Sequence, residues 1–213
     1  MGRRLGGGRL LGSAGLVSAD LPGELEAKLL ARWREPHRRY HDESHLRAGL
    51  LALDELGAGR LERLAFWFHD AVHSCSSPAD EMASAEFARE LLVPLLPAVE
   101  VEEVARLVLV TIGHDPEPGD LSGAMVSDAD LAPLGSQWEV YLANRDAVRA
   151  EQPGLPDDVW LAGRLRFLER FERCGRIFHT PLGSSSWEAA ARRNLTRERL
   201  LVAAQLGRQD GGQ

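Results

Sequence analysis

Apolar residues recur every three or four positions along most of this chain, and this spacing constrains the fold more than any other feature. Leu46, Leu50, Leu53 and Leu56 form one such stripe, which is the pattern of a helix that buries one face. Similar stripes follow within residues 25–33, 61–68, 101–108, 121–145 and 156–171. No run alternates apolar and polar residues for long enough to indicate a strand. The sequence therefore predicts an all-α fold, a single bundle of about seven to nine helices.

The two ends of the chain differ in composition from the part between them. Residues 1–19 are rich in Gly and Arg and residues 208–213 in Gly and Gln, so we expect a flexible tail and a frayed end around one domain at 20–207. No apolar run approaches the ~18 residues of a membrane span, and the basic start lacks the apolar segment of a signal peptide. Two cysteines, Cys75 and Cys174, are too few for a disulfide framework. We therefore expect a cytoplasmic protein with no membrane partner.

The charge balance limits the class of partner. The chain has 25 Lys and Arg against 32 Asp and Glu, which gives a formal net charge of −7. Binding to a nucleic-acid polymer depends on many cationic contacts with phosphates. We therefore expect a small-molecule partner and no nucleic-acid polymer.

Several histidines lie at spacings that suit a shared site. His37, His41 and His45 are four residues apart, so on a helix they would follow one stripe. His69 and Asp70 are adjacent within an otherwise apolar run. Burying an imidazole and a carboxylate costs several kcal/mol unless they are paired or bound to a metal. The dipeptide alone is compatible with either a buried ion pair or a ligand pair.

A second group of acidic residues favours a metal site over a buried ion pair. Asp128 and Asp130 stand two apart in an apolar segment. Together with the histidines they give the order His, His-Asp, Asp, which offers nitrogen and oxygen donors to a divalent cation. Mixed donors of this kind suit a hydrolytic site that leaves positions open for water and substrate, rather than a closed structural zinc site.

In this order the residues resemble the HD superfamily of metal-dependent phosphohydrolases, and in particular its small bacterial branch. The resemblance extends over about residues 25 to 200 and implies an all-α, HD-type fold. Its matching stretches are residues 35–46, 67–70, 81–85, 128–135 and 191–195.

The resemblance implies that His45, His69, Asp70 and Asp130 are the metal ligands. Asp130 is preferred to Asp128 because the last aspartate of the superfamily usually stands directly before an apolar segment, as Asp130 does here. Asp128 would then be a catalytic residue that orients a water, a ligand of a second metal, or a residue that orients His45.

Two further residues take catalytic roles from the resemblance. The segment Tyr40-His41-x-x-x-His45 is similar to that of the cyclic nucleotide phosphodiesterases, which implies that His41 is the general acid. An imidazole with a pKa near ~6.5 can give a proton at neutral pH; the alternative for His41 is a hydrogen-bonding residue behind the ligands. Glu81 matches a family glutamate that could hydrogen-bond a metal-bound water, and is otherwise an exposed acid in the first turn of a helix.

The candidate substrate-binding residues are His37, His114 and Arg38. His114 follows Thr111 without the lysine that the family places between them, and His73 stands where the family usually has tyrosine. Both differences bear on how phosphate is held.

Arg164 and Arg193 are further candidate phosphate partners. Because arginine is abundant in this chain, an exposed surface position is the simplest expectation for each.

These observations predict hydrolysis of a phosphate ester of a small molecule, such as a nucleotide, by a metal-activated water. His and Asp ligands accept Mn, Mg, Fe, Ni, Co or Zn, so the identity of the cation stays open. Two alternatives share the scaffold: a di-iron oxygenase, for which His73 and His114 would supply extra ligands, and a catalytically silent module that binds a nucleotide.

Overall fold

The computed structural model describes residues 21–210, which contain ten α-helices, one short 3-10 helix and no strand. Nine of these α-helices have nine residues or more, and α9 has six. This confirms the all-α prediction. The tail expected at residues 1–19 lies outside the described residues. The last helix continues to Asp210, so it includes the first three residues of the end at 208–213 that the sequence predicted to fray. The other three lie outside the described residues.

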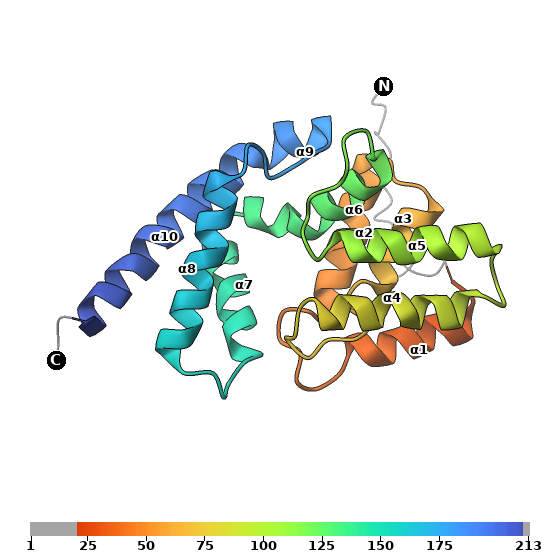
Figure 1. Cartoon of the computed structure of the whole chain (residues 1–213), viewed down its shortest axis with the longest axis horizontal. Helices are drawn as coiled ribbons and strands as arrows, with labels where there is room; N and C mark the ends of the chain where they lie inside the picture. Colours follow the sequence, from red (N-terminus) through yellow and green to blue (C-terminus); the bar gives the residue numbers. More distant parts are fainter. Residues whose placement is uncertain (1–20, 211–213) are drawn as a thin grey trace, which may run out of the picture.

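The helices form two groups, which lie side by side in Figure 1. The first lobe consists of α1 (Gly23–Trp33), α2 (Glu43–Leu56), α3 (Arg60–Phe68), α4 (Ala79–Leu92), α5 (Ala98–Val110) and α6 (Leu121–Leu131). The 3-10 helix η1 (Ala132–Gly135) follows directly. The second lobe consists of α7 (Trp138–Ala150), α8 (Asp157–Arg173), α9 (Pro181–Ser186) and α10 (Glu188–Asp210).

Large aromatic side chains fill the core of the first lobe. Trp33, Phe66, Trp67 and Phe68 are completely buried there, and burial of each such side chain contributes roughly 1.5–3 kcal/mol or more. Gly49 lets α2 approach α3, because a Cβ at this position would lie 1.9 Å from the Phe66 ring. The aromatic cluster thus fixes the distance between the two helices that carry the histidines.

The second lobe has its own core, and a buried polar group ties its helices together. Leu168 and Phe178 are completely buried. The carboxylate of Glu198 on α10 is also buried, and it accepts hydrogen bonds from Arg164 on α8 and from the Tyr141 hydroxyl on α7. This network connects the three long helices of the lobe.

Asn194 on α10 holds the segment that joins the lobes. Its amide nitrogen donates to the carbonyl oxygens of Leu134 and Ser136, at 2.9 and 2.8 Å. The position of η1 between the lobes is thereby fixed. Among the helices of residues 21–210, none combines the length and the apolar character that a membrane-spanning segment needs.

Candidate metal centre

Three helices of the first lobe bring the candidate ligands together. His45 lies in the first turn of α2, which Asp42 caps by accepting hydrogen bonds from the backbone N–H groups of Ser44 and His45. His69 and Asp70 follow the last residue of α3, and Asp130 lies near the end of α6. Residues that are 24 and 60 positions apart in the sequence therefore meet at one point.

His45, His69 and Asp70 form a group that could hold a metal ion, and Asp130 lies at ligand distances from both histidines. His45 Nε2 lies 3.0 Å from Asp130 Oδ1 and 3.3 Å from His69 Nε2. His69 Nε2 lies 3.1 Å from Asp70 Oδ2 and 3.5 Å from Asp130 Oδ1. Two atoms bound to a cation at about 2.1 Å lie about 3.0 Å apart at a right angle and about 3.4 Å apart at the tetrahedral angle. The observed distances cover this range.

The tautomer of His69 also suits a ligand. Its Nδ1 donates a hydrogen bond to the carbonyl oxygen of Phe66, at 2.9 Å, so the neutral ring presents the Nε2 lone pair to the site. His45 Nδ1 is buried and has no hydrogen-bond partner among the described residues. The other ring nitrogen, Nε2, is the atom that lies close to the ligand atoms of Asp130 and His69. The histidine side chains are only 2% exposed, whereas those of Asp70 and Asp130 are 15% and 16% exposed. The site is therefore open on its carboxylate side.

Electrostatic attraction within the group outweighs the cost of burial. Burial by itself would lower the pKa of His69, but the nearby Asp70 and Asp130 hold it well above its usual value. Burial would likewise raise the pKa of both carboxyl groups, but His69 holds the pKa of each below the usual range. A cation would take the place of the proton on His69 and would balance the same two carboxylates.

A second group of possible ligands lies beside the first and consists of His41, His73 and Glu151. His41 Nδ1 donates to Glu151 Oε2 at 2.6 Å, and His73 Nε2 lies 3.3 Å from the same oxygen. A separation of 2.6 Å is shorter than the approximately 3.0 Å expected between two ligands of one cation and is that of a charge-assisted hydrogen bond. These three residues could hold a metal, but their distances fit a hydrogen-bonded group better.

Glu151 also holds the loop that carries His41. Its Oε1 accepts hydrogen bonds from the backbone N–H groups of Arg39, Tyr40 and His41, at 2.8–2.9 Å. Burial would raise the pKa of Glu151, but the bonds from His41, His73 and the backbone lower it far below its usual value. Glu151 is therefore a carboxylate that fixes both the backbone and the ring of His41.

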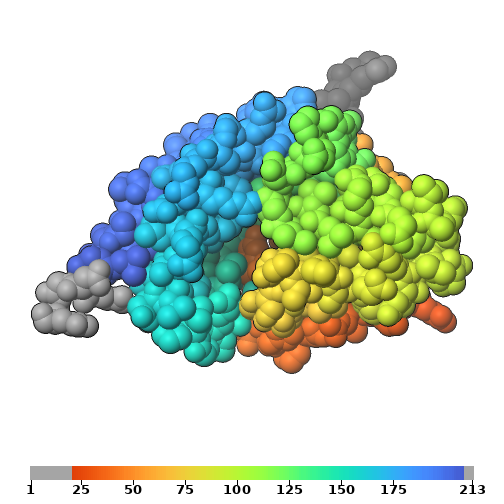
Figure 2. All heavy atoms as spheres, in the orientation of Figure 1, coloured from red at the N-terminus to blue at the C-terminus, as the bar shows by residue number. Residues whose placement is uncertain are grey.

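The four candidate ligands, His45, His69, Asp70 and Asp130, are called the metal group. A cavity of about 250 Å³ opens between the two lobes, beside Asp130 of this group. Asp130, His41 and His114 line it from the side of the first lobe, and Arg164 and Phe167 from α8. Its other lining residues are Tyr40, Leu131, Pro133, Leu134, Tyr141, Asn144, Arg145 and Val148. Figure 2 shows a furrow between α7–α8 and the first lobe on the face in view. Apolar and polar side chains therefore line the same cavity as Asp130.

Asp128 does not join the metal group. Its side chain is completely buried, and it accepts hydrogen bonds from the backbone N–H groups of His179 and Thr180 and from the Thr180 hydroxyl, at 2.7–2.8 Å. Both oxygens are thus engaged by the segment that begins α9. These contacts give Asp128 a part in joining the lobes, rather than the orientation of a water that the sequence suggested.

The other predicted site residues fall in different places. Glu81 is partly buried in α4, and its Oε2 has no hydrogen-bond partner among the described residues. His114 Nε2 lies 3.6 Å from Asp130 Oδ2, and burial lowers the pKa of this imidazole. His37 is exposed and donates to the carbonyl oxygen of His73. His114 therefore reaches the metal group, and His37 does not.

Arg38 is placed inside the protein. Its side chain is completely buried, and it donates to Glu35 and to the carbonyl oxygens of His41 and Ala71. This arrangement supports the loop before α2 and leaves the guanidinium no access to the cavity.

Glu151 and Glu198 are the residues that the sequence did not single out, whereas Arg164 was among the candidate phosphate partners and lines the cavity. One signal for Glu151 was present: it follows directly after a helix, where an acidic side chain opposes the helix dipole. Such a residue usually has another partner, which here is His41.

No protein-family model matches the chain, and neither a curated protein nor a solved structure matches it. The site is therefore interpreted from its own geometry.

Proposed function

We propose that this protein is a metal-dependent phosphohydrolase of the HD superfamily, which hydrolyses a phosphate ester of a small molecule. The observation that carries the proposal is the group of His45, His69 and Asp70, which could hold a metal ion. Asp130 lies 3.0 Å from His45 Nε2 and 3.5 Å from His69 Nε2, and it also lines a cavity. The order of these residues and the all-helical fold agree with the resemblance to that superfamily.

The residues beside the ligands supply the remaining chemistry. A divalent cation bound by the four residues supplies Lewis acidity, which polarises a phosphoryl group and acidifies water. Asp130 Oδ2, with His114 Nε2 3.6 Å away, can hold the attacking water through hydrogen bonds.

His41 is the proton donor in this proposal. Its Nδ1 proton is held by Glu151, so the Nε2 proton of the imidazolium is the one that can be transferred. When the bond between phosphorus and the leaving oxygen breaks, that oxygen keeps the electron pair and takes this proton. His41 is left as the neutral tautomer, whose Nδ1–H still donates to Glu151.

The test is a comparison of metal-loaded protein with matched variants. Protein stripped of metal and reloaded with Mn, Mg, Fe, Ni, Co or Zn is assayed on p-nitrophenyl phosphate, bis-p-nitrophenyl phosphate and nucleoside monophosphates. Asp70→Ala is expected to lose both bound metal and hydrolysis, whereas Asp115→Ala, an exposed acid outside the ligand group, retains both. Equal rates for Asp70→Ala and the unmodified protein would refute the proposal.

Metal analysis separates this function from the oxygenase alternative. That alternative needs extra histidine ligands, and of the two available only His114 approaches Asp130, while His73 bonds Glu151. One cation per chain favours the hydrolase, and two irons per chain favour the oxygenase. Tight nucleotide binding without turnover would instead indicate a binding module.

A further inference from the structure

Arg164 lines the cavity that opens beside Asp130, and its guanidinium is partly free of hydrogen-bond partners among the described residues. It lies on α8, its side chain is 12% exposed, and it lines the same cavity as Asp130 and His41. The cavity is therefore lined both by Asp130, one of the candidate ligands, and by a cationic side chain.

Glu198 and Tyr141 hydrogen-bond this guanidinium, whose carbon also lies 4.5 Å from the centroid of the Phe167 ring. Arg164 Nε and Nη2 donate to the two oxygens of Glu198, each at 2.8 Å, and Nη2 also lies 3.3 Å from the Tyr141 hydroxyl. A bidentate pair with a completely buried carboxylate fixes the plane of the guanidinium. The Nη1 atom has no hydrogen-bond partner among the described residues, and it is not one of their fully buried unpaired atoms. Its two protons are available to a ligand.

The other arginines near the cavity are held differently. Arg145 also lines it, but its guanidinium bonds Asp146, whose side chain is 66% exposed. An ion pair with an exposed partner fixes a side chain only weakly. Arg38 is buried beneath the loop before α2, so Arg164 is the oriented cation of this cavity.

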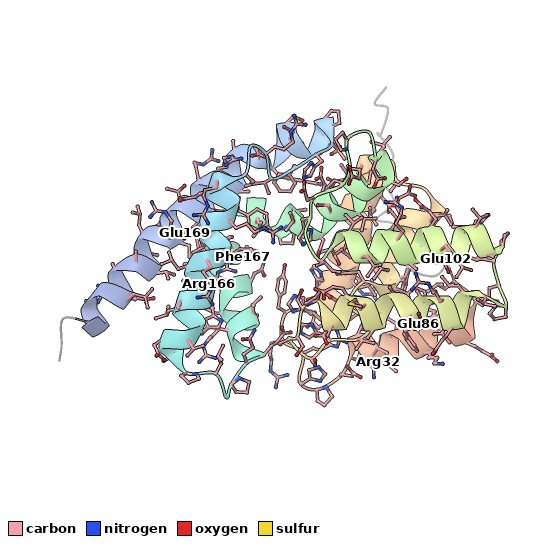
Figure 3. The ribbon with its side chains drawn as sticks, in the orientation of Figure 1. Arg32, Glu86, Glu102, Arg166, Phe167 and Glu169 are labelled. Atoms are coloured by element: carbon pink, nitrogen blue, oxygen red, sulfur yellow. The ribbon has the colours of Figure 1, made fainter. Side chains whose placement is uncertain are left out.

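The rest of the cavity limits the size and character of the ligand. A volume of about 250 Å³ has room for about eight water molecules at about 30 Å³ each, and it is smaller than the cavities that usually hold drug-sized ligands. The walls formed by Leu131, Leu134, Val148 and Phe167 are apolar. In Figure 3 Phe167 lies on the side of α8 that faces the first lobe, and Glu169 lies on the other side. An anionic group with one compact, uncharged substituent fits these walls.

We propose that Arg164 binds an anionic oxygen of the ligand through Nη1, and that Glu198 and Tyr141 position it for this contact. Resting on the proposed function, the anionic group is the phosphate of a monoester, which lies between Arg164 and the metal group. The uncharged substituent of the ester then lies against the apolar wall. Arg164 is a binding residue in this arrangement, and Glu198 is a positioning residue.

The first experiment measures binding of inorganic phosphate by isothermal titration calorimetry, on full-length protein loaded with Mn. Arg164→Lys retains a charge opposite Glu198 but has no second nitrogen for the cavity, so we expect phosphate to bind about tenfold to a hundredfold more weakly. Arg164→Ala is expected to show at least the same loss if it folds. Arg166→Ala, an exposed arginine on the same helix, is the matched control and is expected to bind phosphate as the unmodified protein does. Unchanged phosphate affinity in Arg164→Lys overturns the proposal, and so does an equal loss in Arg166→Ala.

The second experiment tests the positioning role with p-nitrophenyl phosphate as substrate. Glu198→Gln keeps one acceptor for the guanidinium, and we expect a rise in KM of about fivefold to tenfold with little change in kcat. A residue that only stabilises the fold would lower the melting temperature and leave KM unchanged, which would remove Glu198 from the proposal.

The two proposals fail in different ways. If no phosphate ester is hydrolysed but Arg164→Lys weakens phosphate binding, the hydrolase proposal fails and the anion site stands. If esters are hydrolysed and Arg164→Lys has the KM and phosphate affinity of the unmodified protein, the anion site fails and the hydrolase proposal stands.

Discussion

Asp128 and Asp130 stand two residues apart on α6, and they face different neighbours. Two positions along a helix correspond to a rotation of about 200°, so their carboxylates point in nearly opposite directions. Asp130 meets His45 and His69, whereas Asp128 binds the segment that begins α9. The same residue type therefore contributes to the metal group in one case and to the junction of the lobes in the other.

Alanine substitutions are expected to separate these two roles. Asp130→Ala removes a ligand, so metal affinity measured by calorimetry should fall by at least tenfold to a hundredfold. Asp128→Ala leaves two buried backbone N–H groups and one hydroxyl without an acceptor, so unfolding in urea should show a loss of about 2–3 kcal/mol. Its metal affinity should change less than threefold. Loss of metal binding in Asp128→Ala, with little change in stability, would contradict this assignment.

The protonation of His41 predicts the alkaline side of the pH profile. Burial lowers the pKa of His41, but the charge of Asp70 and the hydrogen bond to Glu151 raise it by more than burial lowers it. The pKa of His41 is therefore above its usual value. A general acid works only while protonated, so kcat should fall as pH rises through this raised pKa. Glu151→Gln removes one of the raising causes, and the alkaline limb of log kcat should therefore move to lower pH. An unmoved limb, with kcat otherwise reduced, would show that a different group supplies the proton.

At the scale of helices, close contact between α2 and α3 keeps the two histidines within reach of one cation. Gly49 makes this contact possible, because a Cβ there would overlap the Phe66 ring. The Phe66 ring in turn lies beside both histidines, with centroid distances of 5.8 Å to His45 and 4.3 Å to His69. Widening the gap between the helices would therefore move the ligands apart.

Gly49→Ala is expected to weaken both the fold and the site. The added methyl group should destabilise the protein by about 1–3 kcal/mol through overpacking and lower metal affinity several-fold. Gly163→Ala is the matched control on α8, where the nearest atom to an added Cβ is a flexible arginine end at 3.7 Å. That substitution should be neutral or stabilise the helix by up to about 1 kcal/mol. The measurements are urea unfolding and calorimetric titration with Mn, and equal behaviour of the two variants would disprove the packing argument.

The helices themselves could be predicted because each buries one face, which leaves a period of three to four residues in the sequence. The meeting of His45, His69 and Asp130 followed only from a resemblance, since the sequence does not determine how α2, α3 and α6 pack. The pairing of His41 with Glu151, 110 residues later, depends on how the second lobe packs against the loop before α2. No local pattern records that contact. The burial of Arg38 was missed for a similar reason. Two of its hydrogen-bond partners are backbone carbonyl groups, those of His41 and Ala71, and the sequence does not show that the fold brings these groups to the guanidinium.

At the scale of the whole molecule, the two lobes contribute different residues to the candidate site. All four candidate metal ligands come from the first lobe, whereas Arg164, Tyr141 and Phe167, which line the cavity, come from the second. Glu151, which directly follows α7, holds the His41 loop of the first lobe. Metal binding should therefore depend on one core, and the binding of a phosphate ester on both.

Two leucine substitutions of equal chemistry test this division. Leu53 and Leu168 are both completely buried, in the first and second core respectively, and each change to alanine should cost about 2–5 kcal/mol. Leu168→Ala loosens the lobe that carries Arg164, so KM for p-nitrophenyl phosphate should rise while Mn affinity stays within about twofold. Leu53→Ala lies on α2 with His45, so Mn affinity should fall as well. The KM and the Mn affinity are measured well below the unfolding temperature of each variant. A cation held by the first lobe alone does not respond to a cavity made in the second lobe. The same loss of Mn affinity in both variants would therefore mean that the ligand geometry depends on both cores.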